Sequence, residues 1–186
     1  MRQRILLLLH PGFEELEAVG PIDILRRAGL EVTVASTSDK LAVTGRNKIT
    51  VQANVRLDDI EADSFDAIVV PGGPGVFELR KDARFAELLQ TYAGAGKPVA
   101  AICAAPLLLK DAGLIEGRRK TAHFTCREEI PDLEDDRPFV EDGGIHTSRS
   151  AGDAITFGLG LAARFAGRER AVEVAQSICL GEDAVP

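Results

Sequence analysis

The run Pro98-Val99-Ala100-Ala101-Ile102-Cys103-Ala104-Ala105-Pro106 places a thiol at the end of an uninterrupted apolar segment. Apolar residues without polar alternation are typical of a strand buried on both faces of a parallel sheet. The residues from 104 to 112 have the composition of a helix, so Cys103 is predicted to lie in a sharp turn between strand and helix. Such a turn lifts a side chain out of the sheet and needs small neighbours, as in the nucleophile elbow of serine hydrolases.

Two interpretations of Cys103 follow from this position. Free N–H groups at the start of the next helix stabilise a thiolate, which lowers the pKa of a thiol below its ordinary value of about 8.5. A cysteine in an apolar run is also a common small core residue, with no reactivity. A reactive thiol and a packing residue are therefore both open on position alone.

Other periodic segments divide the chain into alternating strands and helices. The predicted strands are short apolar or alternating runs bounded by turn residues, at 5–9, 31–36, 65–70 and 120–122, with hairpins at 41–55 and 139–148. The predicted helices have apolar residues at helical spacing, at 13–29, 78–95, 104–112, 153–166 and 168–180. Leu16, Val19, Ile22 and Leu25 share one face of the first helix, and Pro21 is expected to kink or interrupt it.

The alternation predicts an α/β fold: one domain over 1–186, built as a three-layer α/β/α sandwich with a flavodoxin-like, mostly parallel sheet. In such sheets ligands bind outside the carboxyl ends of the strands. Three strand ends then converge, namely residues 10–17, residues 71–75 and Cys103. We expect the functional site to lie where these three segments meet.

Composition and charge narrow the possible functions. The 186 residues are 45% hydrophobic, and a net charge of −7 argues against nucleic acid as a partner. The three cysteines, Cys103, Cys126 and Cys179, have no spacing typical of a disulfide framework or a metal site, which favours the reducing cytoplasm. The apolar run at 5–9 is too short for a signal sequence or a membrane span. No metal and no cofactor are expected.

Segments along nearly the whole chain resemble the ThiJ/PfpI family, to which the human parkinsonism-associated deglycase belongs. The matching stretches are 12–17, 23–29, 70–73, 100–106 and 147–149, with a glycine at 152. The elbow with Ala104-Ala105-Pro106 is most similar to the deglycase subfamily and its bacterial relatives. The resemblance implies the architecture shared with class I glutamine amidotransferases, and it implies a homodimer.

The resemblance also implies roles for individual residues. Cys103 would be the nucleophile, Glu17 the acidic residue beside its sulfur, and the N–H groups of Gly73 and Ala104 an anion pocket. Because a carboxylate beside a thiolate would repel it, we expect Glu17 and Cys103 to share one proton. His123 matches a histidine near the thiol in the subfamily and could move a proton, although a structural histidine is the alternative.

The activity implied is that of a cofactor-independent, cysteine-dependent enzyme of glyoxalase III or deglycase type. Its substrates would be α-oxoaldehydes such as methylglyoxal and glyoxal, or their protein adducts. The alternative is an oxidative-stress sensor or redox-regulated chaperone, because an exposed Cys103 thiolate oxidises to sulfinate and has no other cysteine nearby in the sequence. An intracellular cysteine peptidase is disfavoured, because that branch has histidine where this chain has Ala104.

Overall fold

The computed structural model describes residues 3–186 and contains a central sheet of seven strands. In spatial order the strands are β5 (Val55–Arg56), β2 (Glu31–Ser36), β1 (Arg4–Leu9), β6 (Ala67–Val70), β7 (Val99–Ile102), β9 (Ile145–Ser148) and β8 (Phe139–Asp142). Neighbouring strands run parallel except β8 and β9, which form the predicted hairpin. The prediction of a mostly parallel, flavodoxin-like sheet is confirmed.

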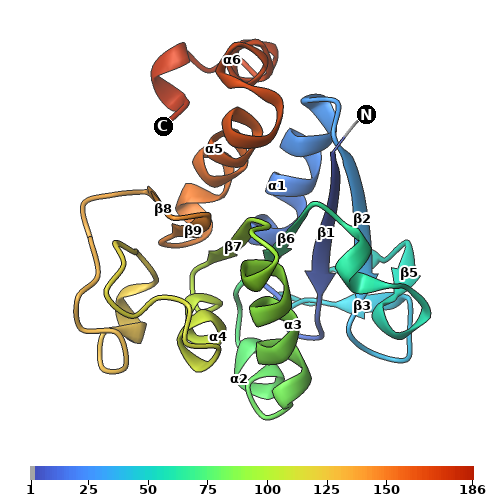
Figure 1. The fold of residues 1–186 in the computed structure, drawn as a ribbon. Helices are drawn as coiled ribbons and strands as arrows, with labels where there is room; N and C mark the ends of the chain where they lie inside the picture. Colours follow the sequence, from blue (N-terminus) through green and yellow to red (C-terminus); the bar gives the residue numbers. More distant parts are fainter. Residues whose placement is uncertain (1–2) are drawn as a thin grey trace.

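Helices cover both faces of this sheet (Figure 1). One face carries α1 (Glu15–Arg27), α5 (Ala154–Ala166) and α6 (Arg168–Ser177). The other carries α2 (Val76–Leu79), α3 (Ala83–Gly94) and α4 (Pro106–Asp111). Short 3-10 turns complete the chain: η1 (Leu57–Asp59), η2 (Ala62–Ser64), η3 (Phe124–Cys126), η4 (Ala151–Asp153) and η5 (Glu182–Ala184).

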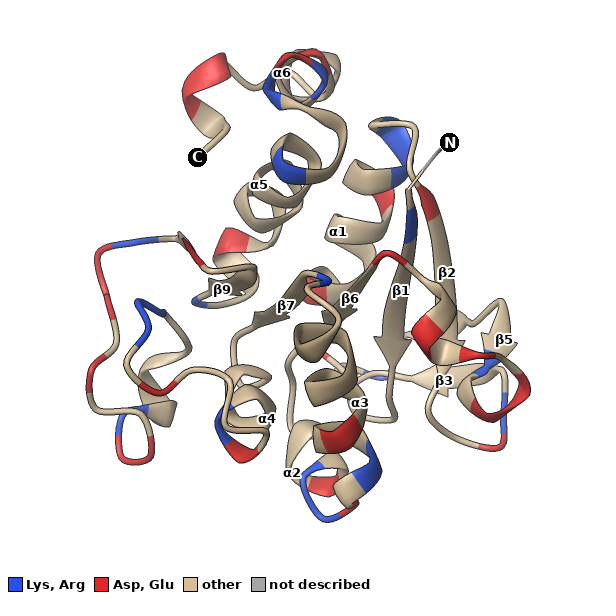
Figure 2. Ribbon diagram, viewed as in Figure 1, with Lys and Arg blue, Asp and Glu red and all other residues tan. Residues whose placement is uncertain are grey.

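The apolar run of β1 explains how one strand serves two cores. Ile5, Leu7 and Leu9 pack under α1 and α5, whereas Leu6 and Leu8 pack under α3 and α4. Successive side chains of a strand point to opposite faces, so a strand covered on both sides must be apolar at every position. Charged residues lie mainly in loops and on the outer turns of helices (Figure 2).

The first helix differs from its prediction in two respects. Pro21 does not interrupt α1, because buried residues on both sides of it, Ala18 and Ile22, hold the helix against the core. Leu16 and Val19 do not face that core and are 60% and 46% exposed. The buried face instead includes Glu17, a charged residue type that is rarely buried without a partner.

Two further predictions need correction. The helix predicted at 78–95 is divided into α2 and α3, because Asp82 caps a new helix by accepting a hydrogen bond from the Arg84 N–H at 3.0 Å. The strand predicted at 120–122 is absent from the described chain; the N–H of Thr121 donates to the Thr147 hydroxyl at 2.9 Å instead of to a ladder partner. The other predicted strands and helices are present, with boundaries shifted by a few residues.

A separate two-stranded ribbon is formed by β3 (Ala42–Thr44) and β4 (Thr50–Gln52), as predicted. Its turn lies beside the start of α1, where the Arg46 N–H donates to the Phe13 carbonyl at 2.8 Å. Across residues 3–186, no helix has both the length and the apolar character that a membrane span requires.

Candidate active site

Cys103 lies at the elbow between β7 and α4, as predicted. Its φ of 66° lies in the left-handed region, which a residue with a side chain adopts only when its surroundings impose it. The Cys103 N–H donates to the Ser148 carbonyl of β9 at 3.0 Å, and this bond ties the elbow to the sheet. The thiol is partly exposed, so the elbow presents it to ligands at the carboxyl end of the sheet.

The Cys103 carbonyl connects the elbow to the segment that follows α4. It accepts the N–H of His123 at 2.9 Å and the thiol of Cys126 at a sulfur–oxygen distance of 3.7 Å. Cys126 lies in η3 and is buried. The elbow and η3 therefore form one hydrogen-bonded unit.

Glu17 reaches the site from the first turn of α1. Glu14 caps this helix, and its carboxyl Oε2 accepts the Glu17 N–H at 3.0 Å. The Glu17 side chain is fully buried, and its Oε2 accepts the N–H of Gly72 at 2.9 Å. Its Oε1 has no nitrogen or oxygen partner within residues 3–186, and the carboxyl interacts with the Cys103 side chain.

The loop after β6 must contain glycine to fit between these groups. A Cβ atom at Gly72 would lie 2.5 Å from the Glu17 Oε2 and 2.6 Å from the Cys103 Cβ. Gly73 has a φ of 104°, and a Cβ there would lie 2.5 Å from the carbonyl oxygen of Gly12. Among the described residues, the Gly73 N–H donates no hydrogen bond. The loop thus brings backbone N–H groups close to the thiol.

The electrostatics of the pair follow from its burial. Burial raises the pKa of the Glu17 carboxyl to about 7, against the hydrogen bonds from Cys103 and Gly72 that lower it. The expectation of a Cys103 pKa below its ordinary value is wrong. Burial and then the charge of Glu17 raise that pKa, and the Ala104 N–H opposes them. Glu17 and Cys103 therefore hold two protons below about pH 7 and one proton above it, and they do not lose both because two buried charges would repel.

His123 lies next to the site, but its imidazole does not contact the thiol directly. Its Nδ1 is 2.8 Å from the Thr125 hydroxyl oxygen, and its ring packs on that of Phe124 with centroids 4.2 Å apart. Burial and the charge of Arg46 lower the pKa of His123, so the imidazole is neutral at pH 7. A role in proton transfer would use Nε2. The other two histidines, His10 and His146, are buried in the core.

Arg46 is a charged neighbour of the site that sequence reasoning missed. The turn of the β3–β4 ribbon is held by the buried carboxylate of Glu15, which accepts the Asn47 N–H at 2.7 Å and the Asn47 side-chain amide at 3.0 Å. The guanidinium of Arg46 lowers the pKa of both Glu17 and His123. In the sequence Arg46 is part of a predicted turn, and no local pattern indicates that it lies close to Glu17 and His123.

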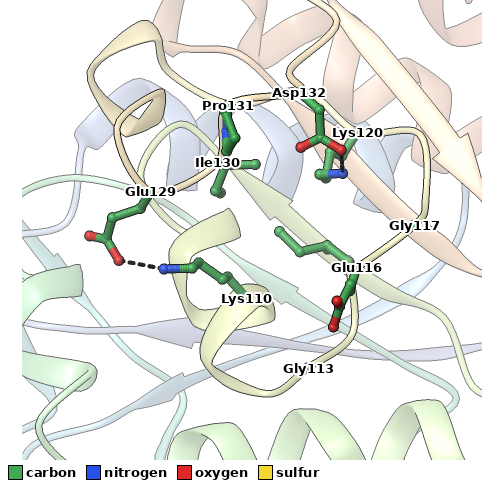
Figure 3. A pocket seen from close by; sticks show the side chains of 10 residues that line it. Lys110, Gly113, Glu116, Gly117, Lys120, Glu129, Ile130, Pro131 and Asp132 are labelled. Carbon is green, nitrogen blue, oxygen red and sulfur yellow. Dashed lines mark hydrogen bonds and ion pairs between the residues drawn. The ribbon is translucent and has the colours of Figure 1, made fainter.

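Two hollows lie on this side of the sheet, and Cys103 lines neither of them. One, of about 570 Å³, opens beside His123 and Phe124 and is closed by Arg149 and Asp153. The second, of about 520 Å³, lies at the far end of α4 between Lys110 and Lys120 and contains none of the predicted site residues (Figure 3). Within residues 3–186, no three His, Cys, Asp or Glu side chains gather as metal ligands.

These features define a class of protein: an α/β sandwich in which a strained elbow presents a thiol to a buried carboxyl group. Residues 3–164 match the model of the DJ-1/PfpI family, and the chain belongs to this family. The resemblance seen in the sequence is thereby confirmed.

Individual relatives agree with this assignment. The chain is 34% identical over 182 residues to Protein dj-1beta of Drosophila melanogaster, covering 96% of this chain and 97% of the relative. It is 34% identical over 153 residues to Deglycase PfpI of Pyrococcus furiosus, covering 81% and 92%. The crystal structure of Drosophila melanogaster DJ-1beta superposes with a TM-score of 0.93 at 34% identity, covering 97% of this chain and 100% of that one. Some relatives are thus named as enzymes.

Proposed function

We propose that this protein is a cofactor-independent, cysteine-dependent enzyme of the glyoxalase III or deglycase type. Its substrates are α-oxoaldehydes such as methylglyoxal and glyoxal, or the adducts that they form with proteins. The observation that carries the proposal is the buried Glu17 carboxyl beside the Cys103 thiol, with a pKa of about 7 for Glu17. A carboxyl with this pKa exchanges protons readily at neutral pH. The relatives named deglycases support the same class of reaction.

The first step forms a bond between sulfur and the aldehyde carbon. Glu17, as the carboxylate, takes the thiol proton while the Cys103 sulfur attacks, and the carbonyl π bond breaks. The resulting oxyanion lies against the N–H groups of Gly73 and Ala104, which stabilise the developing charge. A proton then converts the oxyanion to the hydroxyl of a hemithioacetal.

The second step moves hydrogen between the two carbons of the substrate. A base removes the proton from the carbon that carries sulfur, and the neighbouring carbonyl carbon gains one, which gives the thioester of a 2-hydroxy acid. Glu17 performs this transfer, assisted by the neutral imidazole of His123. Water then cleaves the thioester, which releases the hydroxy acid and restores the thiol. The sum is one oxoaldehyde and one water converted to one hydroxy acid.

The hollow beside His123 supplies room for a substrate larger than methylglyoxal. Its volume of about 570 Å³ suits the side chain of a glycated residue, and the exposed ring of Phe124 offers an apolar wall. Arg46 adds a positive charge near Glu17 and His123, which attracts a substrate or product carboxylate. These features extend the proposal from free oxoaldehydes to protein adducts.

The protein is proposed to act as a homodimer in the cytoplasm. Leu16 and Val19 form an exposed apolar strip on α1, next to the turn that carries Glu17. A second copy packed on this strip would remove apolar surface from water and hold the first turn of α1 in place. The three free cysteines suit a reducing compartment.

Turnover of methylglyoxal to lactate by the wild-type protein tests the enzyme proposal. The Cys103→Ala variant should lose activity, whereas Cys179→Ala, which removes an exposed cysteine elsewhere, should keep it. Lactate formation that survived in Cys103→Ala would overturn the cysteine mechanism.

A sensor or redox-regulated chaperone is the second candidate function. One observation favours this second function: among the described residues, the Oε1 of Glu17 has no nitrogen or oxygen partner. When protonated, Oε1 would donate a hydrogen bond to an oxygen of the oxidised Cys103 side chain. A protein without oxoaldehyde turnover, in which peroxide still oxidises Cys103, would fit this candidate instead. A peptidase is not supported, since Ala104 follows the thiol and the Nδ1 of His123 is engaged by Thr125.

A further inference from the structure

Cys126 lies close to Cys103 in space, although 22 residues separate them in the chain. Its sulfur is 3.7 Å from the Cys103 carbonyl oxygen. Both cysteines are free, and both pack against the core between the sheet and α4. The third cysteine, Cys179, is exposed and follows the end of α6, so it is not part of the group formed by Cys103 and Cys126.

The two thiols are near neighbours, because besides burial and Glu17 a charge on Cys126 raises the pKa of Cys103. A carbonyl oxygen lies about 2.4 Å from its own Cα, so the Cys126 sulfur lies within about 6 Å of the Cys103 Cα. A disulfide requires Cα atoms roughly 4.4–6.8 Å apart, so η3 has to move only slightly toward the elbow for the link to close. The proposed link therefore combines rotation of the Cys103 side chain toward η3 with this small movement of η3.

The surroundings hold Cys126 in place for such a reaction. The Cys126 N–H donates to the His123 carbonyl at 2.8 Å, and the His123 N–H donates to the Cys103 carbonyl at 2.9 Å. Cys126 is only 3% exposed, so a peroxide in solution reaches Cys103 first. Cys126 is therefore shielded from reagents in solution but remains available to react with Cys103 inside the protein.

We propose that Cys126 is the resolving thiol of Cys103, and that a hydroperoxide converts the pair to an intramolecular disulfide. The proposal shares with the proposed function a nucleophilic Cys103, and it adds a reversible oxidised state that stops turnover. Glutathione or another cellular thiol would restore the enzyme by thiol–disulfide exchange. Overoxidation of Cys103 to sulfinate, which thiols do not reverse, would be limited at low peroxide concentration.

The chemistry proceeds in two balanced steps. The Cys103 thiolate attacks one peroxide oxygen, so that a sulfur–oxygen bond forms and the oxygen–oxygen bond breaks. The alkoxide or hydroxide that leaves takes up the proton lost by the thiol and becomes the alcohol or water. The Cys126 thiolate then attacks the sulfenic sulfur, so that the disulfide forms and hydroxide leaves and is protonated to water. Two thiols and one hydroperoxide thus give one disulfide, one alcohol (water from hydrogen peroxide) and one water.

A second molecule of peroxide competes with Cys126 for the sulfenic acid. The disulfide forms without further reagent, so it dominates at one equivalent of peroxide, and sulfinate gains at large excess. Burial raises the pKa of Cys126, so its thiolate is scarce at pH 7. The share of disulfide should therefore increase as the pH rises.

The test treats reduced protein with one equivalent of hydrogen peroxide and measures intact mass without reductant. The wild type and Cys179→Ser should lose about 2 Da, the two thiol hydrogens. Cys126→Ser, which keeps the volume and a donor for the Cys103 carbonyl, should instead gain about 16 Da at Cys103 as a sulfenic acid, and about 32 Da when a second equivalent of peroxide is added. Trypsin separates the two cysteines, so the linked peptides identify the bond; the cleavable residues between them are Lys110, Arg118, Arg119 and Lys120.

The outcomes distinguish this proposal from the proposed function. Sulfinate at Cys103 in wild type and Cys126→Ser alike, or a link from Cys103 to Cys179, would overturn the resolving role and leave the enzyme proposal standing. A Cys103 inert to peroxide and to methylglyoxal would overturn both. If Cys126→Ser is unstable, Cys126→Ala serves as the second variant, because alanine fits the same small buried site and also lacks the thiol.

Discussion

Glu17 and Cys103 both lie against Gly72, and neither leaves room for a Cβ at that position. A Cβ at Gly72 would lie 2.5 Å from the Glu17 Oε2 and 2.6 Å from the Cys103 Cβ. The Gly72 N–H also donates to that oxygen at 2.9 Å. The glycine therefore sets the distance between the carboxyl and the thiol, and with it the sharing of their proton.

Gly72→Ala should abolish this arrangement. The methyl group must displace the Glu17 carboxyl or the elbow, so we expect methylglyoxal turnover to fall by at least about 10²-fold, as when a positioned acid or base is lost. Gly94→Ala is the matched control, because a Cβ at Gly94 meets nothing within 4 Å. Circular dichroism checks that both variants fold. Normal turnover in Gly72→Ala would show that the pair does not need this spacing.

Glu17→Gln should keep the shape of the Glu17 side chain but remove its ability to transfer a proton. The amide can still accept from Gly72, but it cannot take the thiol proton, so kcat/KM should fall by roughly 10²–10⁴-fold. In the wild type kcat/KM should rise with pH through about 7, as Glu17 becomes a base. In Glu17→Gln this rise should vanish. Glu17→Asp, whose side chain is shorter, should be intermediate. A Glu17→Gln variant with nearly full turnover would rule out the proton shuttle.

The same substitution should change stability in a pH-dependent way. Burial raises the pKa of Glu17 from 4.5 to about 7, so the folded state binds this proton more tightly than the unfolded state. Its contribution to stability is complete below pH 4.5 and is lost as pH rises to about 7. Above that pH, Glu17→Gln should therefore be more stable than wild type, by on the order of 3 kcal/mol at most. Urea unfolding at pH 5 and pH 8 measures the difference, and equal effects at both would contradict the assigned pKa.

Arg46→Met should move the pH profile of the enzyme. The guanidinium lowers the pKa of Glu17, so its removal should shift the rise of kcat/KM to higher pH, by a fraction of a unit because Arg46 is exposed and screened by solvent. Added salt should shift the wild type in the same direction. Lys48→Met, in the same turn, is the matched control and should leave the profile unchanged. An identical profile for Arg46→Met would exclude an electrostatic role.

His123→Ala tests whether the imidazole assists the reaction. We expect roughly a tenfold loss of kcat, less than for a principal acid or base, since its Nδ1 bonds to Thr125 rather than to the thiol. The His123 N–H that donates to the Cys103 carbonyl belongs to the backbone and is kept in the variant. Thermal unfolding should therefore change little. An unchanged kcat would assign His123 a structural role only.

Local patterns in the sequence were sufficient to predict most of the fold. Apolar runs such as 5–9 and 98–102 mark strands covered on both faces, because burial on both sides requires an apolar residue at every position. The small residues around Cys103 predict the elbow, since only they allow the backbone to turn sharply there. The same patterns misjudged α1, where a buried acidic residue and an internal proline oppose the usual rules.

Which residues come together in the site depends on contacts between segments that are distant in the sequence. Only the tertiary structure decides these contacts. The resemblance suggested Glu17, Gly73 and Ala104 as neighbours of Cys103. The pKa values of Glu17 and Cys103 are raised by burial, which depends on how α1 and the loop after β6 pack against the elbow. Arg46 lies near Glu17 and His123 because Glu15 holds a separate ribbon in place. Cys126 lies near the thiol because η3 bonds to the elbow. Hydrophobic periodicity indicates which face of a segment is buried and which is exposed to solvent. It does not indicate which segments pack against each other.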